Sequence, residues 1–333
     1  TLLYKMKRCR TNLFLLLLLT LLTACSDINP PTQQSPDKFP TKNLQIICPW
    51  GAGGGTDRIS RYFADQIAKK LGKNCVVVNK TGGSGAVGHN AGANARPDGH
   101  TIAMITAELS TMHQLGITSK TYKDYIPLLQ MNGDPAAIIV AKDSPWNTID
   151  QFLAAIRTSP GTIKMSGTAT GGAWDLARVG MLQAADLTKD DTIWVPTQGS
   201  AESLQQLLGG HLDAVCCSVP EAALQIKNGT LKCIVVMSAD RTPGFPDIPT
   251  LKEAHIDWTC IGWRGLAVQI DTPPMIVDKL IAVTQEIARS TDFTNFMETQ
   301  GFGIEIRIGD NFLEFLADQD SQWSDVTKHY GEK

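Results

Sequence analysis

Short apolar runs alternate with amphipathic stretches along much of the chain, a pattern typical of strands followed by helices. In the first part, apolar runs predict strands at 44–48, 75–79 and 101–106. Between the first two strands, apolar residues recur every fourth position and predict a helix that ends near Leu71. A helix of small residues is predicted over 86–95. Continuous apolar strands joined by helices predict a parallel sheet covered on both faces.

The same pattern restarts after residue 148 and predicts a second α/β block. The predicted helices of this block are 149–158, 173–185, 200–208 and 220–228, and its predicted strands are 163–166, 192–195, 212–217 and 231–238. Beyond it, helices are predicted at 274–289, 292–300 and 310–328. The pattern therefore indicates an α/β protein with two blocks and a helical C-terminal part.

Three glycine-rich loops, at 49–57, 81–85 and 167–172, each join a predicted strand to a predicted helix. A helix N-terminus presents unpaired N–H groups and a partial positive charge, and glycine lets a ligand approach that backbone. Loops of this kind that converge on one cleft would bind carboxylates or phosphates. A dinucleotide site is disfavoured, because Thr56 stands where its third glycine belongs and Asn79-Lys80 replaces the acidic residue.

The N-terminus is predicted to be an export signal rather than part of the fold. Four basic residues precede an apolar run at 13–22, which is too short to span a membrane, and Leu22-Thr23-Ala24-Cys25 has the form of a lipobox. We therefore predict a signal peptide over 1–24, lipidation of Cys25, and a flexible tether over 25–40 that is rich in Pro, Ser, Gln and Thr. The alternative is an ordinary secretory signal with a cysteine nearby.

Charge and cysteine content narrow the function further. The chain has 30 basic and 33 acidic residues, and removal of residues 1–24 leaves 26 basic residues and a net charge of −7. This balance argues against nucleic-acid binding. Six cysteines lie beyond Cys25. We expect their side chains to be small buried hydrophobes, or a disulfide to join Cys216 or Cys217 to Cys233. No spacing indicates a metal site, and the histidines are expected to be ordinary surface or loop residues.

The loops and several other segments together resemble a known family, the tripartite tricarboxylate transporter receptors, also called Bug receptors. The resemblance covers essentially the whole chain from residue 44. The segments that carry it are PWGAGGGTD (49–57), VVVNKTGGSGAVG (76–88), ARPDGHT (95–101), VPTQG (195–199), LLGGHLD (207–213), PDIPT (246–250) and WRGLA (263–267).

The resemblance implies a type II periplasmic-binding-protein fold, in which two α/β lobes with parallel-rich sheets, joined by a hinge, close on a small carboxylated solute. Residues 41–140 and 262–333 should form the first lobe and 141–261 the second. The family also implies delivery to a permease with one large and one small membrane subunit, no catalysis, no cofactor and a monomeric receptor. The protein should lie outside the cytoplasm, in the periplasm or on the outer face of the cytoplasmic membrane.

The resemblance also implies ligand contacts from three loops and the cleft around them. The expected ligand-binding residues are Trp50, Gly51, Ala52, Gly53, Ser84, Gly85, Ala86, Thr106, Thr168, Ala169, Trp174, Thr197 and Ser218. For Asp57 we favour a structural role in the first turn of a helix over ligand contact. For Trp50 we favour the pocket wall, and Trp174 could line the pocket or pack between the lobes. Arg264 is expected to form a hinge salt bridge.

The chain departs from the family pattern at positions that are expected to contact the ligand. Trp174-Asp175 replaces a His-bearing loop end, Thr197-Gln198 replaces a Tyr-Lys or Tyr-Arg pair, and Cys217-Ser218-Val219 replaces Asp-Asn-Leu. Loss of basic groups and gain of Asp175 favour a ligand with one carboxylate and a neutral or cationic far end over citrate. A second function stays open, in which the loaded receptor signals to a membrane sensor kinase. No catalytic set is recognisable.

Overall fold

The computed structural model describes residues 38–242 and 244–331. The predicted signal peptide, Cys25 and nearly all of the predicted tether lie outside these residues. Within the described residues, no helix is long and apolar enough to cross a membrane.

The first half of the sheet contains the three strands predicted near the N-terminus. Strand β1 (Leu44–Cys48) lies between β2 (Cys75–Asn79) and β3 (Thr101–Thr106), and it pairs with both in parallel. Helices α2 (Gly55–Leu71) and α3 (Ala86–Ala93) connect these strands, as the periodicity predicts, although α3 ends two residues earlier than expected. Each glycine loop therefore lies between the carboxyl end of a parallel strand and a helix N-terminus.

Two long strands that the sequence pattern did not predict join the halves of the sheet. Strand β4 (Tyr125–Ala141) pairs antiparallel with β9 (Ile261–Gln269) as far as Pro135, and from Ala136 onward it pairs with strands of the second half. Strand β9 also pairs antiparallel with β3. The parallel pairing expected from the sequence therefore holds for β1, β2 and β3 but not for β4 and β9. The sheet is mixed, because chain segments that pass between its halves run against the neighbouring strands.

The second half repeats the strand–helix pattern on a smaller scale. Parallel pairs join β5 to β6 and β5 to β7, and β8 pairs antiparallel with β4. The strands are β5 (Lys164–Ser166), β6 (Ile193–Trp194), β7 (Ala214–Ser218) and β8 (Leu231–Val236); the helices are α4 (Ile149–Thr158), α5 (Ala173–Ala184), α6 (Ser200–Leu208) and α7 (Ala223–Lys227). The helix predicted at 220–228 begins as a 3-10 turn, Val219–Ala222, and only then becomes α7.

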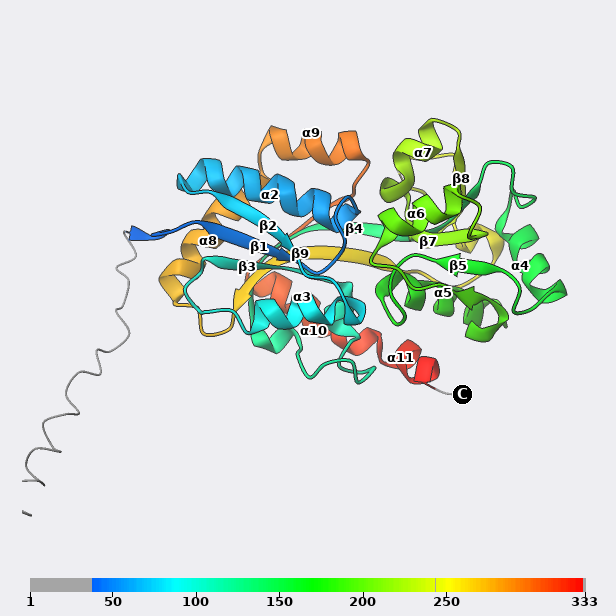
Figure 1. The fold of residues 1–333 in the computed structure, drawn as a ribbon, viewed down its shortest axis with the longest axis horizontal. Coiled ribbons are helices and arrows are strands. Elements are labelled where there is room, and N and C mark those ends of the chain that lie inside the picture. Colours follow the sequence, from blue (N-terminus) through cyan, green and yellow to red (C-terminus); the bar gives the residue numbers. More distant parts are fainter. Residues whose placement is uncertain (1–37, 243, 332–333) are drawn as a thin grey trace, which may run out of the picture. The chain divides into compact units, whose positions relative to one another are not determined.

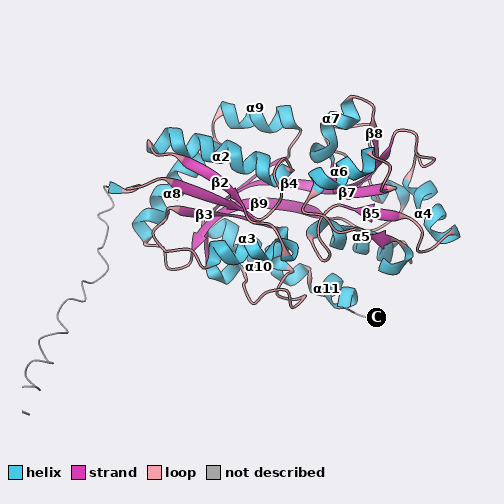
Figure 2. Ribbon diagram, in the orientation of Figure 1, coloured by secondary structure: helices cyan, strands magenta, loops and turns pink. Residues whose placement is uncertain are grey.

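Most of the C-terminal part returns to the first half, whereas its last helix packs against α5 of the second half. Its elements are α8 (Pro274–Ala288), α9 (Thr291–Gln300), β10 (Ile304–Ile308), α10 (Asp310–Gln322) and α11 (Ser324–Gly331). Strand β10, which was not predicted, pairs with β4, and the helix predicted at 310–328 is interrupted at Trp323. Helices α2 and α9 lie on one side of the strands and α3 and α10 on the other (Figures 1 and 2). The α/β periplasmic-binding-protein-like fold expected from the sequence is confirmed.

All six cysteines in the described residues are free thiols, so the proposed bridge to Cys233 is wrong. Cys216 pairs with Ile138 across one edge of β4, whereas Cys233 pairs with Ile139 across the other edge. Two strand spacings separate β7 from β8, about 10 Å, and a disulfide needs Cα atoms within about 7 Å. The interpretation of these cysteines as small buried hydrophobes holds for Cys216 and Cys217, which are inaccessible to solvent.

Candidate functional site

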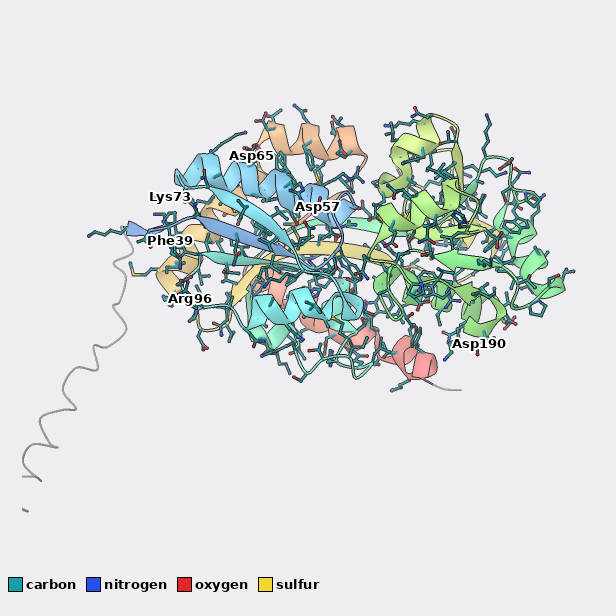
Figure 3. The ribbon with its side chains drawn as sticks, in the orientation of Figure 1. Phe39, Asp57, Asp65, Lys73, Arg96 and Asp190 are labelled. Carbon is teal, nitrogen blue, oxygen red and sulfur yellow. The ribbon has the colours of Figure 1, made fainter. Side chains whose placement is uncertain are left out.

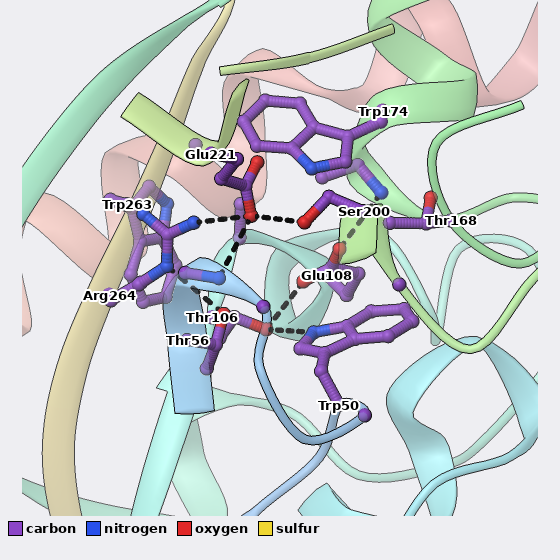
Figure 4. Close-up of a pocket in the computed structure, with 17 residues that line it drawn as sticks. Trp50, Thr56, Thr106, Glu108, Thr168, Trp174, Ser200, Glu221, Trp263 and Arg264 are labelled. Carbon is purple, nitrogen blue, oxygen red and sulfur yellow. Dashed lines mark hydrogen bonds and ion pairs between the residues drawn. The ribbon is translucent and has the colours of Figure 1, made fainter. Parts of the chain in front are cut away.

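A small cavity lies where the glycine loops of the two halves meet (Figure 4). Its volume is about 30 Å³, enough for about two water molecules. The lining residues are Trp50, Gly51, Gly54, Gly55, Thr56, Thr106, Ala107, Glu108, Thr168, Ala173, Trp174, Gly199, Ser200, Glu221, Gly262, Trp263 and Arg264. Both glycine-loop helices that line it, α2 and α5, contribute their first turns.

Asp57 fixes the first glycine loop from within the first turn of α2 (Figure 3). Its carboxylate accepts the Gly53 N–H at 2.9 Å and bonds to Arg61 and Asn79. Burial alone would raise the pKa of this carboxyl, but these donors outweigh burial and hold the pKa below its ordinary value. The structural interpretation of Asp57 is therefore confirmed.

Thr106, at the end of β3, is the centre of a buried hydrogen-bond chain beside the cavity. Its backbone N–H donates to Nε2 of His89 at 3.2 Å, and its hydroxyl bonds to the Glu108 carboxylate. Nδ1 of His89 bonds to the Gly85 carbonyl at 2.8 Å, and Nε1 of Trp50 lies 3.4 Å from the Thr106 hydroxyl. The first two loops are thus fixed to β3 through one threonine and one histidine.

His89 is buried, not the surface residue that the sequence suggested. Burial lowers the pKa of its imidazole to about 4. An unfolded chain binds a proton at His89 near pH 6.5, whereas the folded chain does so only near pH 4, so acidification through this window favours unfolding. We expect this residue to contribute a loss of about 3 kcal/mol between pH 6.5 and 4. The free energy of unfolding of His89→Gln, measured with urea over this range, should fall less steeply than that of wild type.

The exposed His211 provides the matched control. His211→Gln should keep the wild-type pH dependence, since the side chain of His211 is exposed to solvent. Parallel stability curves for wild type and His89→Gln would contradict the neutral, buried state of His89.

Arg264, on β9, is the centre of a buried ion-pair cluster. Its guanidinium bonds to Asp134 on β4 at 3.0 Å and to Glu221 of the second half at 3.3 Å. It also donates to Thr56 and Asn132. Even beside this cation, burial raises the pKa of the Asp134 carboxyl above its ordinary value. The salt bridge expected for Arg264 is present and joins β9, β4, α2 and the second half, while its role at a hinge stays a prediction.

Two helix N-termini at the cavity are each capped by a glutamate from the opposite half. Glu221 accepts the Gly55 N–H of α2 at 3.3 Å and the Ser200 hydroxyl at 2.7 Å. Glu108, in the turn after β3, accepts the Ala173 N–H of α5 at 3.0 Å, and burial raises the pKa of its carboxyl. Figure 4 shows both carboxylates among the residues that line the cavity. These contacts hold the two halves together across the cleft.

Comparison with known proteins decides the family. The model of the tripartite tricarboxylate transporter family receptors, TctC, matches residues 59–331. The chain belongs to this receptor family. Its members are substrate-binding receptors rather than enzymes, and they work outside the cytoplasm.

Three solved structures resemble this receptor over most of their length. A TctC solute-binding protein from Polaromonas, solved with no ligand, is 36% identical, covers 87% of this chain and 99% of its own, and gives a TM-score of 0.64. The periplasmic binding protein BugD is 27% identical over 88% of this chain and 99% of its own, with a TM-score of 0.83. MatC from Rhodopseudomonas palustris, solved with malate, is 23% identical, covers 87% of this chain and 100% of its own, and gives a TM-score of 0.82.

Five of the residues predicted for the receptor's site line the cavity: Trp50, Gly51, Thr106, Thr168 and Trp174. The other eight do not line it: Ala52, Gly53, Ser84, Gly85, Ala86, Ala169, Thr197 and Ser218. Some of these hold the loops together. The Ser84 hydroxyl donates to the Thr170 carbonyl across the cleft, the Thr197 hydroxyl bonds to Ser203, and Ser218 donates to Glu221. Trp174 both lines the cavity and packs over Gly262, so its two expected roles coexist.

The argument on ligand charge that rested on Asp175 is wrong. Asp175 is fully buried, pairs with Arg178 at 2.7 Å, and accepts the Gly171 N–H and the Tyr330 hydroxyl. Its charge is compensated inside α5 and does not line the cavity. The acidic residues of this receptor's cavity are instead Glu108 and Glu221.

Sequence reasoning missed Glu108, Glu221, Ser200 and Thr56 as cavity residues. One signal for Glu221 was available, because Ser218 and Glu221 have the spacing of a capping box, which the structure contains. Glu108 follows the carboxyl end of β3, the edge of a parallel sheet where ligands usually bind. In the described residues, no group of three His, Cys, Asp or Glu side chains could hold a metal ion.

Proposed function

We propose that this receptor captures a small carboxylated solute between the two halves of its sheet and delivers it to a tripartite tricarboxylate permease. The observation that carries the proposal is the cavity that the first glycine loop lines between the two halves of the sheet, because glycine lets a carboxylate approach the loop backbone closely. The malate bound to MatC supports the chemical class of the solute. Membership of the family supports the proposed permease partner, which would have one large and one small membrane subunit.

Ligand entry requires the halves to separate. The cavity of about 30 Å³ is far smaller than a dicarboxylate, since it has room for only about two water molecules. The halves are joined by β4 and β9, and direct bonds between them close the cleft, such as Gly51 N–H to the Gln198 carbonyl at 2.9 Å. The Polaromonas protein superposes less closely than BugD despite its higher identity, as expected if the halves of such receptors reorient. We infer a hinge within these two strands.

The backbone of the first two loops is proposed to hold one carboxylate of the solute. On this proposal Trp50 to Gly53 and Ser84 to Ala86 surround the carboxylate, while Thr106, Thr168, Ala169, Trp174, Thr197 and Ser218 contact or position the remainder. The proximity of Gly85 to the Trp50 ring supports this arrangement, since a Cβ at Gly85 would lie 3.3 Å from that ring.

A thermal-shift screen with small-angle scattering tests the binding function. A carboxylate present at about one hundred times its Kd should stabilise the folded protein by roughly 2.7 kcal/mol. We therefore expect at least one mono-, di- or tricarboxylate or amino acid to raise the Tm by several degrees, and the same compound to decrease the radius of gyration. A complete absence of Tm shifts would contradict the binding role, and an unchanged radius with ligand bound would contradict hinge closure.

We propose further that Cys25 carries a lipid that tethers the receptor to a membrane. When the full chain is expressed in a bacterial host with its signal, wild type should be recovered in the membrane fraction and should incorporate labelled palmitate. Cys25→Ser should lose the label and leave the membrane fraction. Cys75→Ser, which removes a thiol of the folded part, is the matched control and should keep both. Label in Cys25→Ser would place the lipid elsewhere.

A further inference from the structure

The strongest anion donors at the cavity already have carboxylate partners within the protein. The N-terminus of α2 donates from Gly55 to Glu221, and the N-terminus of α5 donates from Ala173 to Glu108. The Ser200 hydroxyl also bonds to Glu221. In this closed arrangement, a second carboxylate of a ligand would have to displace one of these glutamates to reach either helix N-terminus.

The positive charge at the cavity is also paired with carboxylates of the protein. Among the described residues that line it, Arg264 is the one basic side chain. Its guanidinium is shared between Asp134 and Glu221 and also donates to Thr56 and Asn132. Glu108, which is 3% exposed, has neutral donors only: the Ala173 N–H and the Thr106 hydroxyl. A buried carboxylate without a paired cation is costly, so an incoming cation would find a compensating charge here.

Two aromatic rings complete the cavity wall. Trp50 and Trp174 are 7% and 5% exposed and line the cavity together with Glu108 and Glu221 (Figure 4). Indole faces attract ammonium groups through the ring quadrupole, and the attraction strengthens where water is excluded. Two tryptophan rings, Glu108 without a paired cation, and Glu221, which shares Arg264 with Asp134, therefore form a wall suited to a cation rather than to an anion.

We propose that the cavity binds the ammonium group of a zwitterionic solute between Trp50, Trp174, Glu108 and Glu221, so that Glu108 and Glu221 select amino-acid-like ligands against di- and tricarboxylates. The inference rests on the proposed function, because the solute's carboxylate stays with the first two glycine loops. It assigns a cationic far end to the ligand from Glu108 and Glu221, in place of Asp175, which does not line the cavity.

Matched pairs of probes that differ only in the ammonium group test the inference. The pairs are 4-aminobutyrate with butyrate, glutamate with glutarate, and phenylalanine with 3-phenylpropionate; succinate, malate and citrate complete the panel. After a thermal-shift screen, calorimetry gives the Kd of the best probe and of its partner. We expect the best probe to carry an ammonium group and to bind about tenfold or more tightly than its deaminated partner.

Glu108→Gln removes the negative charge of the side chain but keeps its size and shape. Its amide oxygen can accept the Ala173 N–H and its NH₂ can donate to the Thr106 hydroxyl oxygen, so the variant should fold. It should bind the ammonium probe about tenfold more weakly and leave the Kd of the deaminated partner within about threefold. Glu298→Gln, on the exposed face of α9, should change neither.

The outcomes separate the two proposals. If a carboxylate without a cation binds wild type as tightly as its ammonium counterpart, the ammonium site is overturned and the receptor function stands. If Glu108→Gln weakens both members of a pair equally, the residue shapes the cleft and does not select charge, which also overturns the inference. If no probe of either kind binds, the proposed function fails, and the inference fails with it.

Discussion

Arg264→Met should lower the free energy of unfolding by about 3–5 kcal/mol, because it leaves Asp134 and Glu221 buried without their shared cation. Both carboxylates are almost inaccessible to solvent, so water cannot replace the guanidinium. The pKa of Asp134 is already raised by burial, and this carboxyl can take up a proton, which limits the cost. Urea and thermal unfolding of the dialysed protein would measure the change, which corresponds to about 10 °C in Tm.

Two further variants locate the source of this effect. Arg241 forms an exposed ion pair with Glu253 at 2.9 Å, and Arg241→Met should leave the Tm close to that of wild type, because solvent screens an exposed pair. Arg264→Lys should be intermediate, because an ammonium keeps the charge but cannot reach Thr56, Asp134 and Glu221 with one planar fork. An Arg264→Met protein as stable as Arg241→Met would show that the cluster contributes little to folding.

Gly167→Ala should destabilise the second half and displace Trp174. A Cβ at Gly167 would lie 2.1 Å from the Cys216 carbonyl oxygen and 2.9 Å from the Cβ of Trp174, so either β7 or the third glycine loop must move. Overpacking of this kind costs about 1–3 kcal/mol, and contact with backbone in a paired strand places the variant at the upper end. The Tm should fall accordingly, and the ligand found in the thermal-shift screen should bind more weakly.

Gly244→Ala is the control for the glycine effect, since no atom lies within 4 Å of its Cβ position. Its stability should stay within about 0.5 kcal/mol of wild type. A Gly167→Ala variant with wild-type stability and affinity would mean that the loop can move away from β7 at no cost. The role of Gly167 would then be unexplained.

The elements with local hydrophobic periodicity were predictable, whereas the strands that join the halves were not. Helix α2 has a continuous apolar face and a glycine at its end, so its bounds follow from neighbouring residues. Strand β4 carries Gln130, Asn132 and Asp134 on alternate positions, all buried, and proline follows directly at 135. Polar alternation of this kind normally indicates solvent exposure. Here the alternate positions face buried partners, including Arg264 for Asn132 and Asp134.

The residues of the site likewise divide into those that the sequence could predict and those that it could not. The glycine loops, Trp50 and Thr106 could be predicted, since a strand, a glycine run and a helix start are neighbours in the sequence. Glu108 and Glu221 could not be assigned to the site, because each caps a helix 65 or 166 residues away. Asp175 was expected to affect the charge of the ligand site. Its charge is instead paired with Arg178, only three residues further along the chain.

The sequence by itself determined the strand–loop–helix units, the export and lipidation signals that we propose, and the family. These depend on residues that are close together in the chain. Only the tertiary structure decided which helix N-terminal donors remain available to a ligand. Glu108 and Glu221 take two of these donors from across the cleft, and the electrostatic preference of the cavity therefore depends on side chains that only folding brings to the loops.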